Sequence, residues 1–414
     1  MNGKWVALGL AAALAVGLCA CREETANRVE QVPNPEPTQT SAPTEETPIE
    51  AYQEALRQLL EEHIWLDEYH YRDDEWDVEY FAFGISDVDM DGDPELIVRI
   101  DRNTCVYGYD REQAELIREL EGGIRCRFYD NATAQLDSNH QTNGLAGRFW
   151  PYEASKYDEK VGEYQGIGSV DAFDLEIMKE VGAESIYPQE IDIEGAGFVY
   201  YITRDGEKTA MSQTEYNVWY ESIFGGAEEI EVNYRPLTRE DIQNGCARAA
   251  YEVFLAGDMS LLEPVEPGWA EHVALMIKAA MEYTYLDLDE DGVDELLLQC
   301  PNDPMSYNGV FHYEDGMLQC WQHDEVEMSC RDYPLQDGTM VRQYRESYYL
   351  FRYQPDGSEK ELTSLGAIQS PDGDVYLYRV DGKDVEKTEF DRQVKSLVTD
   401  RLLEREAWTA ILPQ

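Results

Sequence analysis

The sequence predicts an α+β fold made of two duplicated, β-rich antiparallel meander units, each flanked by short helices. The first observation is an internal repeat in the chain of 414 residues, because residues 85–96 return as residues 285–296. The second is a series of short alternating runs rich in Tyr, Val, Phe and Ile, punctuated by Asp-Gly and Gly-Gly hairpin signals. The third is spacing: the intervals between these runs are too short for crossover helices, which argues against a parallel sheet.

The chain begins with a segment typical of an export signal. Lys4 supplies a positive charge, and the apolar run that follows it is too short for a comfortable membrane span. The sequence Leu18-Cys19-Ala20-Cys21 then resembles the lipobox of bacterial lipoproteins, in which the Cys after a small residue is lipidated. The resemblance implies that residues 1–20 are a lipoprotein signal peptide and that Cys21 carries acyl chains. The protein would then be lipid-anchored at the extracytoplasmic face of the cell membrane.

Residues 21–47 predict a disordered acidic tether rich in Pro and Thr. The stretch contains almost nothing apolar after Val32, so it cannot offset the entropy of ordering and should stay extended. We expect it to hold the folded part of the chain away from the membrane.

Two repeat units are expected after the tether, over residues 48–236 and 237–414. Each opens with a helix. Thr47 and Glu50 form a capping box with Pro48 at the first helical position. In the second unit Thr238 and Asp241 start the helix, and Gly257 marks its end.

The ends of the two units also match. Residues 200–207 and 376–383 each predict a strand that turns at Asp-Gly and leads to a short helix with one apolar face. Apolar residues recur on both helices at i, i+4, i+7 and i+8. They are Tyr216, Tyr220, Ile223 and Phe224 in the first unit and Phe390, Val394, Leu397 and Val398 in the second. Matches in the same order along both units indicate a duplication.

Charge narrows the set of partners. The chain has 85 Asp and Glu residues against 33 Lys and Arg, a formal net charge of −52. A chain this acidic repels phosphate backbones, so no nucleic acid is expected as a partner. It lacks a Gly-rich phosphate loop ending in Gly-Lys-Ser or Gly-Lys-Thr, so no nucleotide is expected either. Carboxylates in surplus suit hard cations, which prefer oxygen ligands.

The repeated segment carries the strongest chemical signal. In both copies Asp occupies positions 1, 3 and 5, Gly position 6 and Glu position 9, and alternate carboxylates on a tight turn converge on one point. The backbone carbonyl of position 7 can add a further ligand, as expected for Ca²⁺. The predicted ligands are Asp87, Asp89, Asp91, Asp93 and Glu95 in the first loop and Asp287, Asp289, Asp291, Val293 and Glu295 in the second. We therefore expect two Ca²⁺ ions.

The loops are not those of an EF-hand, because position 12 is Val98 or Leu298 rather than Glu. Strands are expected on both sides, at residues 80–83 and 96–98 and at residues 283–285 and 296–298. The nine-residue form resembles the hairpin calcium loops of FG-GAP and VCBS repeats, as in integrin-α propellers, although the period of 200 residues does not fit a propeller. The whole chain resembles lipoproteins of Gram-positive gut anaerobes that combine a lipobox, an acidic tether and such a loop. That resemblance carries no known activity with it.

The remaining reactive residues give no catalytic pattern. No Gly-x-Ser-x-Gly elbow and no His-Glu-x-x-His occur, and no two of the six His residues share a metal-ligand spacing. His312 lies in an alternating strand and is assigned to the core or the surface. Six cysteines follow Cys21, and export permits disulfides without fixing their pairing.

Two functions are consistent with these features. The first is a non-enzymatic, calcium-binding lipoprotein that serves as a binding or scaffold protein at the cell surface, with a glycan or another exported protein as partner. The alternative is an exported hydrolase acting on cell-wall or dietary glycan. The acidic, aromatic stretch at residues 65–76 could serve a hydrolase, since aromatic faces stack on sugars and paired carboxylates catalyse glycoside hydrolysis. The absence of this stretch from the second unit favours a loop that covers the core.

Overall fold

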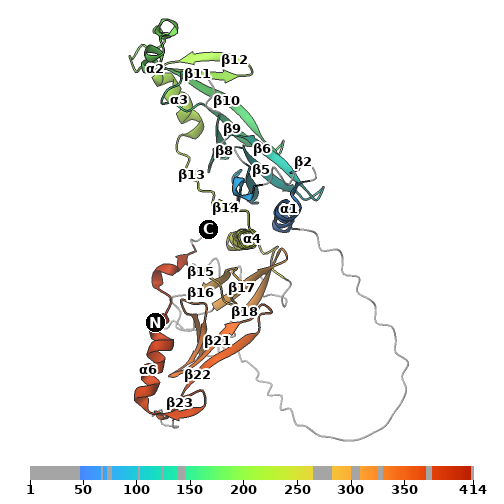
Figure 1. Cartoon of the computed structure of the whole chain (residues 1–414), viewed down its shortest axis with the longest axis vertical. Coiled ribbons are helices and arrows are strands. Elements are labelled where there is room, and N and C mark those ends of the chain that lie inside the picture. Colours follow the sequence, from blue (N-terminus) through green and yellow to red (C-terminus); the bar gives the residue numbers. More distant parts are fainter. Residues whose placement is uncertain are drawn as a thin grey trace, which may run out of the picture. The chain divides into compact units, whose positions relative to one another are not determined.

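The computed structural model describes residues 47–66, 69–71, 77–100, 103–123, 125–138, 145–263, 282–299, 308–323, 330–369 and 375–411. Residues 46–414 form one compact unit, and the expected signal peptide, Cys21 and the tether up to residue 46 lie outside the described residues. Two five-stranded sheets, one seven-stranded sheet and one six-stranded sheet form its framework, and every strand pair within them is antiparallel (Figure 1). A short hairpin, β1 (Ile64–Trp65) with β2 (Tyr69–His70), accompanies them.

The two five-stranded sheets are built alike. In the first unit the strands are β3 (Phe81–Ser86), β4 (Glu95–Ile100), β5 (Asn103–Asp110), β6 (Glu115–Gly122) and β14 (Arg235–Pro236), in the order β14-β3-β4-β5-β6. In the second they are β15 (Glu282–Leu286), β16 (Glu295–Gln299), β17 (Asn308–Glu314), β18 (Met317–His323) and β25 (Thr409–Ala410), in the order β25-β15-β16-β17-β18. A meander of four strands is thus closed at the same edge by a short strand from the end of its unit.

The larger sheets follow the same plan. The first unit has β7 (Cys126–Tyr129), β8 (Thr133–Asp137), β9 (Tyr152–Asp158), β10 (Glu163–Asp174), β11 (Phe198–Arg204), β12 (Glu207–Met211) and the edge strand β13 (Glu229–Ile230). The second has β19 (Cys330–Pro334), β20 (Met340–Tyr344), β21 (Ser347–Tyr353), β22 (Glu359–Gln369), β23 (Val375–Val380) and β24 (Lys383–Val385). Strands β7 to β12 and β19 to β24 each form a meander in sequence order, and β13 pairs with β7 at the edge of the first sheet. The predicted fold class, with two duplicated antiparallel meander units, is therefore confirmed.

Helices flank both units, and those at residues 48–62 and 239–255 begin at the predicted capping residues. The helices are α1 (Pro48–Glu62), α2 (Leu175–Glu180) and α3 (Gln213–Phe224) in the first unit and α4 (Arg239–Leu255) and α6 (Lys387–Leu397) in the second. Single 3₁₀ turns are η1 (Val78–Tyr80), η2 (Glu184–Ile186), η3 (Thr399–Arg401) and η4 (Arg405–Ala407). The predicted capping box of Thr47 forms, Ser212 forms a second one at the start of α3, and Thr238 accepts the Asp241 amide at 3.0 Å. Tyr80, expected in a strand, belongs to η1 instead.

The five-stranded sheets are buried on both faces, which explains the continuous apolar runs in their central strands. In β4, Leu96 and Val98 point into a core that contains α1 and α4, whereas Ile97 points into a core shared with β7 and β8. In β16, Leu297 likewise packs against β20 and β21. The outer faces of the larger sheets are covered by α3 and α6, with Phe224 and Phe390 buried. Each unit therefore stacks helix, sheet, sheet and helix.

The two units share one hydrophobic core. Its members include Leu56 of α1, Phe254 of α4 and strand residues from both five-stranded sheets. The Gln53 side chain of α1 donates to Gln243 of α4 at 2.8 Å and accepts from Tyr313 of β17 at 2.8 Å. Helix α1 thus contacts β17 of the second unit, and neither five-stranded sheet completes its core alone.

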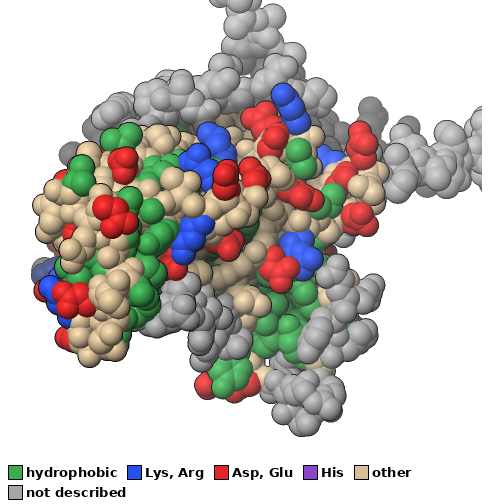
Figure 2. Space-filling model, turned by 90° about the horizontal axis from the view of Figure 1, so that it is seen from above, with side chains coloured by type: hydrophobic (Ala, Val, Ile, Leu, Met, Phe, Trp, Pro, Cys, Tyr) green, Lys and Arg blue, Asp and Glu red, His purple; other side chains and the backbone are tan. Residues whose placement is uncertain are grey.

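Two further observations concern the surface and the membrane. On the face shown in Figure 2, Asp and Glu side chains lie among Lys and Arg side chains. Among the described residues, no helix combines the length and the apolar character needed to span a bilayer.

Candidate metal centres

The two aspartate loops are hairpin connections, one between β3 and β4 and the other between β15 and β16. Ser86 pairs with Glu95 and Leu286 pairs with Glu295, so each loop runs from the end of one strand to the first residue of the next. Position 4 takes a positive φ in both loops, 67° at Met90 and 68° at Glu290. Position 6 does so at 99° and 90°, a backbone conformation that Gly adopts without strain. Backbone geometry is therefore the same in the two loops.

The same four hydrogen bonds hold both loops. The Asp at position 1 accepts the amide of position 4 at 2.7 Å in each. The Asp at position 3 accepts the amide of position 5, at 2.9 and 3.1 Å, and the Asp at position 5 accepts that of position 7, at 2.8 and 2.7 Å. The Glu at position 9 accepts the amide of position 2 at 2.7 Å in each. Each of these carboxylates thus binds the backbone through one oxygen. In the second loop the Asp287 Oδ2 atom also accepts the Gly292 amide at 3.2 Å, and the Glu295 Oε1 atom lies 2.9 Å from His312 Nδ1.

The remaining oxygen of the position 3 aspartate is the most informative atom of each loop. Asp89 is 3% exposed and Asp289 is 9% exposed, and the Oδ2 atom of each is buried without a hydrogen-bond partner. Burying a carboxylate oxygen with no partner is costly. A cation beside it would supply the missing interaction.

The structure gathers most of the predicted ligands into three groups, two of which share Asp289. In each group, one ligand atom per residue lies within 4.8 Å of the others. In the first loop the group is Asp87, Asp89 and Glu95; in the second, the groups are Asp287, Asp289 and Asp291, and Asp289, Glu295 and His312. Carboxylate oxygens this close together are the type of ligand that Ca²⁺ takes.

Electrostatics agree with this arrangement. Burial, and then the charge of neighbouring carboxylates, raises the pKa of Asp89 to about 6 and that of Glu95 to about 10. In the second loop burial raises the pKa of Glu295 only to about 7, because the hydrogen bond from His312 opposes the shift. Without a cation these carboxylates cannot all stay ionised, since like charges at short range disfavour one another.

The remaining predicted residues lie differently. The Asp93 carboxylate turns to Arg111, with 3.0 Å between Oδ1 and Nη2, so only its backbone carbonyl keeps the predicted role. The Asp91 side chain lies outside the first group, although its Oδ1 holds the Asp93 amide. The Val293 side chain is buried in the shared core and leaves only its carbonyl for an ion.

Each loop is also fixed to the larger sheet of its unit. The residues at position 2, Val88 and Leu288, are fully buried in the cores between the two sheets. The Tyr164 hydroxyl of β10 donates to the Val88 carbonyl at 2.7 Å. In the second unit a Cβ at Gly338 would lie 2.0 Å from the Asp287 carbonyl, so the turn between β19 and β20 needs glycine there. Ordering a loop therefore also orders the sheet-to-sheet packing.

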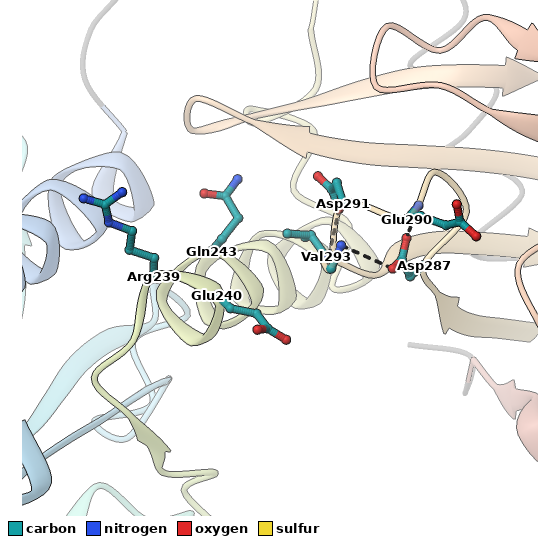
Figure 3. A pocket seen from close by; sticks show the side chains of 8 residues that line it. Arg239, Glu240, Gln243, Asp287, Glu290, Asp291 and Val293 are labelled. Carbon is teal, nitrogen blue, oxygen red and sulfur yellow. Dashed lines mark hydrogen bonds between the residues drawn. The ribbon is translucent and has the colours of Figure 1, made fainter.

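Helix α4 adds a second clamp to the second loop. Asn244 donates to the Gly292 carbonyl at 2.7 Å and accepts the Asp294 amide at 3.3 Å. Between the start of α4 and the loop is an open pocket of about 500 Å³ (Figure 3). Its lining side chains are mostly polar and come from Arg239, Glu240, Gln243, Asp287, Glu290, Asp291 and Val293, with Gly292 completing the wall.

Two residues near the loops fall outside the motif. His312 is buried, as a core residue should be, but its Nδ1 lies 2.9 Å from the Glu295 Oε1 atom and its ring stacks on Trp321. Glu119 of β6 lies close enough to Asp89 and Asp91 for their charge, after burial, to raise its pKa to about 8. Strand alternation could have placed His312, because Phe311 and Tyr313 face the helices. Nothing local marks Glu119.

The comparisons with known proteins add no family. No protein-family model matches this chain, and no curated protein matches it.

Proposed function

We propose that this protein is an exported, calcium-stabilised lipoprotein that acts as a non-enzymatic binding or scaffold protein at the extracytoplasmic face of the cell membrane. The observation that carries the calcium assignment is the buried, unpartnered Oδ2 of Asp89, which recurs at Asp289 in a loop of matching geometry. A turn that merely capped an acidic hairpin would leave these oxygens exposed to water or paired with a donor.

A bound ion would supply positive charge at the centre of each loop. The aspartates at positions 1, 3 and 5 and the glutamate at position 9 would hold it, with the position 7 carbonyl as a further ligand. Because position 2 of each loop is inserted between the two sheets, holding the loop holds their packing. The role of the ion in this proposal is structural, and the binding surface is carried by the braced units.

The anchor and the partner follow from the sequence. A lipobox at Cys21 and an extended tether would display the folded units outside the membrane. The net charge of −52 favours a neutral or basic partner, with an attraction that weakens as salt is added. A neutral glycan or a basic exported protein fits that chemistry.

The calcium assignment is tested by thermal melting and calorimetry of the full chain with Ca²⁺ and with chelator. One site filled at 100-fold excess over Kd adds about 2.7 kcal/mol. Asp89→Asn and Asp289→Asn should each remove part of the stabilisation. Asp93→Asn is the matched control, since it removes the same charge from the same loop but from a side chain that faces Arg111. Melting that ignores both Ca²⁺ and chelator would refute the assignment.

The non-enzymatic part has its own test. Incubation with cell-wall and polysaccharide substrates in Ca²⁺ buffer should release no product, whereas a glycan array should show binding. Sustained release that a single carboxylate-to-amide change eliminates would establish the hydrolase instead.

A further inference from the structure

The two loops match, but the strands beside them do not. The β5–β6 and β17–β18 pairs carry a bulge at corresponding places: register shifts after Val106 in the first pair and after Val310 in the second. The extra residue in the first bulge is Glu119, and in the second it is Trp321. A bulge re-aims the side chain that it carries.

The residue that faces each bulged side chain has changed with it. Gly108 lies two residues after Val106, and His312 lies two residues after Val310. A Cβ at Gly108 would lie 2.0 Å from the Glu119 Oε1 atom, so Glu119 lies across the bare α-carbon. In the second unit the His312 ring fills the corresponding place and stacks on Trp321 at 4.3 Å between ring centroids. One unit thus places a carboxylate there and the other an imidazole.

These two side chains have opposite effects on the carboxylates of their loops. Glu119 lies outside the group formed by Asp87, Asp89 and Glu95, but its negative charge acts on Asp89 and Glu95, and its Oε2 atom is buried without a hydrogen-bond partner. His312 instead occupies the Oε1 atom of Glu295 at 2.9 Å, while the backbone amide of Leu288 occupies Oε2. The first site therefore has one carboxylate more than its loop supplies. In the second site, both oxygens of the loop glutamate already have hydrogen-bond partners.

We propose that Glu119 is a fifth carboxylate of the first calcium site and that it makes this site the tighter of the two. The inference rests on the proposed calcium binding. Ligand charge count and rigidity tune calcium affinity over several decades. Calcium should consequently fill the first loop before the second, so that the first unit is braced at ion concentrations that leave the second unit empty.

The test is calorimetric titration of the metal-free full chain with Ca²⁺, which should show one tight and one weak class. Asp89→Asn should abolish the tight class and Asp289→Asn the weak one. Glu119→Gln keeps the shape of the side chain, removes its charge and should weaken the tight class about tenfold or more. Glu121→Gln is the matched control, because it removes a charge from the same strand at an exposed residue paired with Arg118.

The melting temperature of the metal-free proteins gives a second, independent test of the proposal. Because Glu119→Gln relieves repulsion among the carboxylates, the metal-free variant should melt higher than the metal-free wild type and gain less from Ca²⁺. Two binding classes that are both unaffected by Glu119→Gln, or a tight class that belongs to Asp289, would overturn the role of Glu119 and leave calcium binding intact. No heat of binding at all would instead refute the proposed function.

Discussion

Removing the buried side chain at position 2 of the second loop should destabilise the protein strongly. Leu288 is fully buried among Leu297, Val310, Met340, Phe351 and Tyr353, between the two sheets of its unit. Leu288→Ala deletes three carbon atoms, worth about 2.5 kcal/mol in transfer free energy at ~0.8 kcal/mol each. The cavity left between rigid sheets adds to this, so we expect a total loss of about 3 kcal/mol, within the usual range of about 2–5 kcal/mol.

The assay is equilibrium unfolding in urea, followed by circular dichroism, in excess Ca²⁺ and again in chelator. Glu290→Ala is the control in the same loop, because the Glu290 side chain is exposed, and its largely buried partner Arg352 keeps a hydrogen bond to the Asp337 carbonyl at 2.6 Å. Because solvent screens the exposed Glu290 carboxylate, losing this pair should cost at most about 1 kcal/mol, well below the cost of Leu288→Ala. Leu288→Ala should also weaken the second calcium site, since loss of the anchoring side chain frees residue 288 to move and its backbone amide holds Glu295. Equal costs for the two variants would refute the conclusion that packing anchors the loop to the larger sheet.

Three other outcomes are expected. Thr47→Ala should destabilise the protein by about 1 kcal/mol in urea unfolding, through loss of the α1 cap. A cost no larger than that of replacing an exposed residue in the middle of the helix with Ala would contradict the cap. In the metal-free protein Asp89 and Glu119 have folded-state pKa values raised to about 6 and about 8, above the unfolded values near 4, so their contribution to stability is fully present below about pH 4 and is lost as pH rises through about 6 to 8. In chelator the melting temperature should fall as pH rises across that window, and in Ca²⁺ it should change little. A melting temperature in chelator that rises with pH would contradict the prediction. Cys21→Ser should abolish fatty-acid labelling and release the protein from the membrane fraction, whereas a variant that still labels would rule out the lipobox.

Local chemistry made much of the fold and of the site predictable. Capping boxes at Thr47 and Ser212 join residues three apart, and the Asp-Gly turns at Asp205 and Asp381 join adjacent strands, so neighbouring residues suffice to specify them. The loops are equally local, because nine consecutive residues supply their carboxylates, their glycine and their hydrogen bonds. Repetition of these short-range signals in the same order predicted the duplication.

Only the tertiary structure shows the core shared by the two units and the difference between the two metal centres. Helix α1 joins the second unit through Gln53 and Tyr313, which are 260 residues apart, so the single shared core follows from packing that no local pattern encodes. The difference between the metal centres likewise depends on bulges that bring Glu119 over Gly108 and His312 against Trp321. A bulge shifts register by one residue, and sequence alternation alone cannot show where that shift falls. The sequence by itself thus determined two equal loops, and only the pairing of neighbouring strands made them unequal, because strand register decides which side chain reaches the carboxylates.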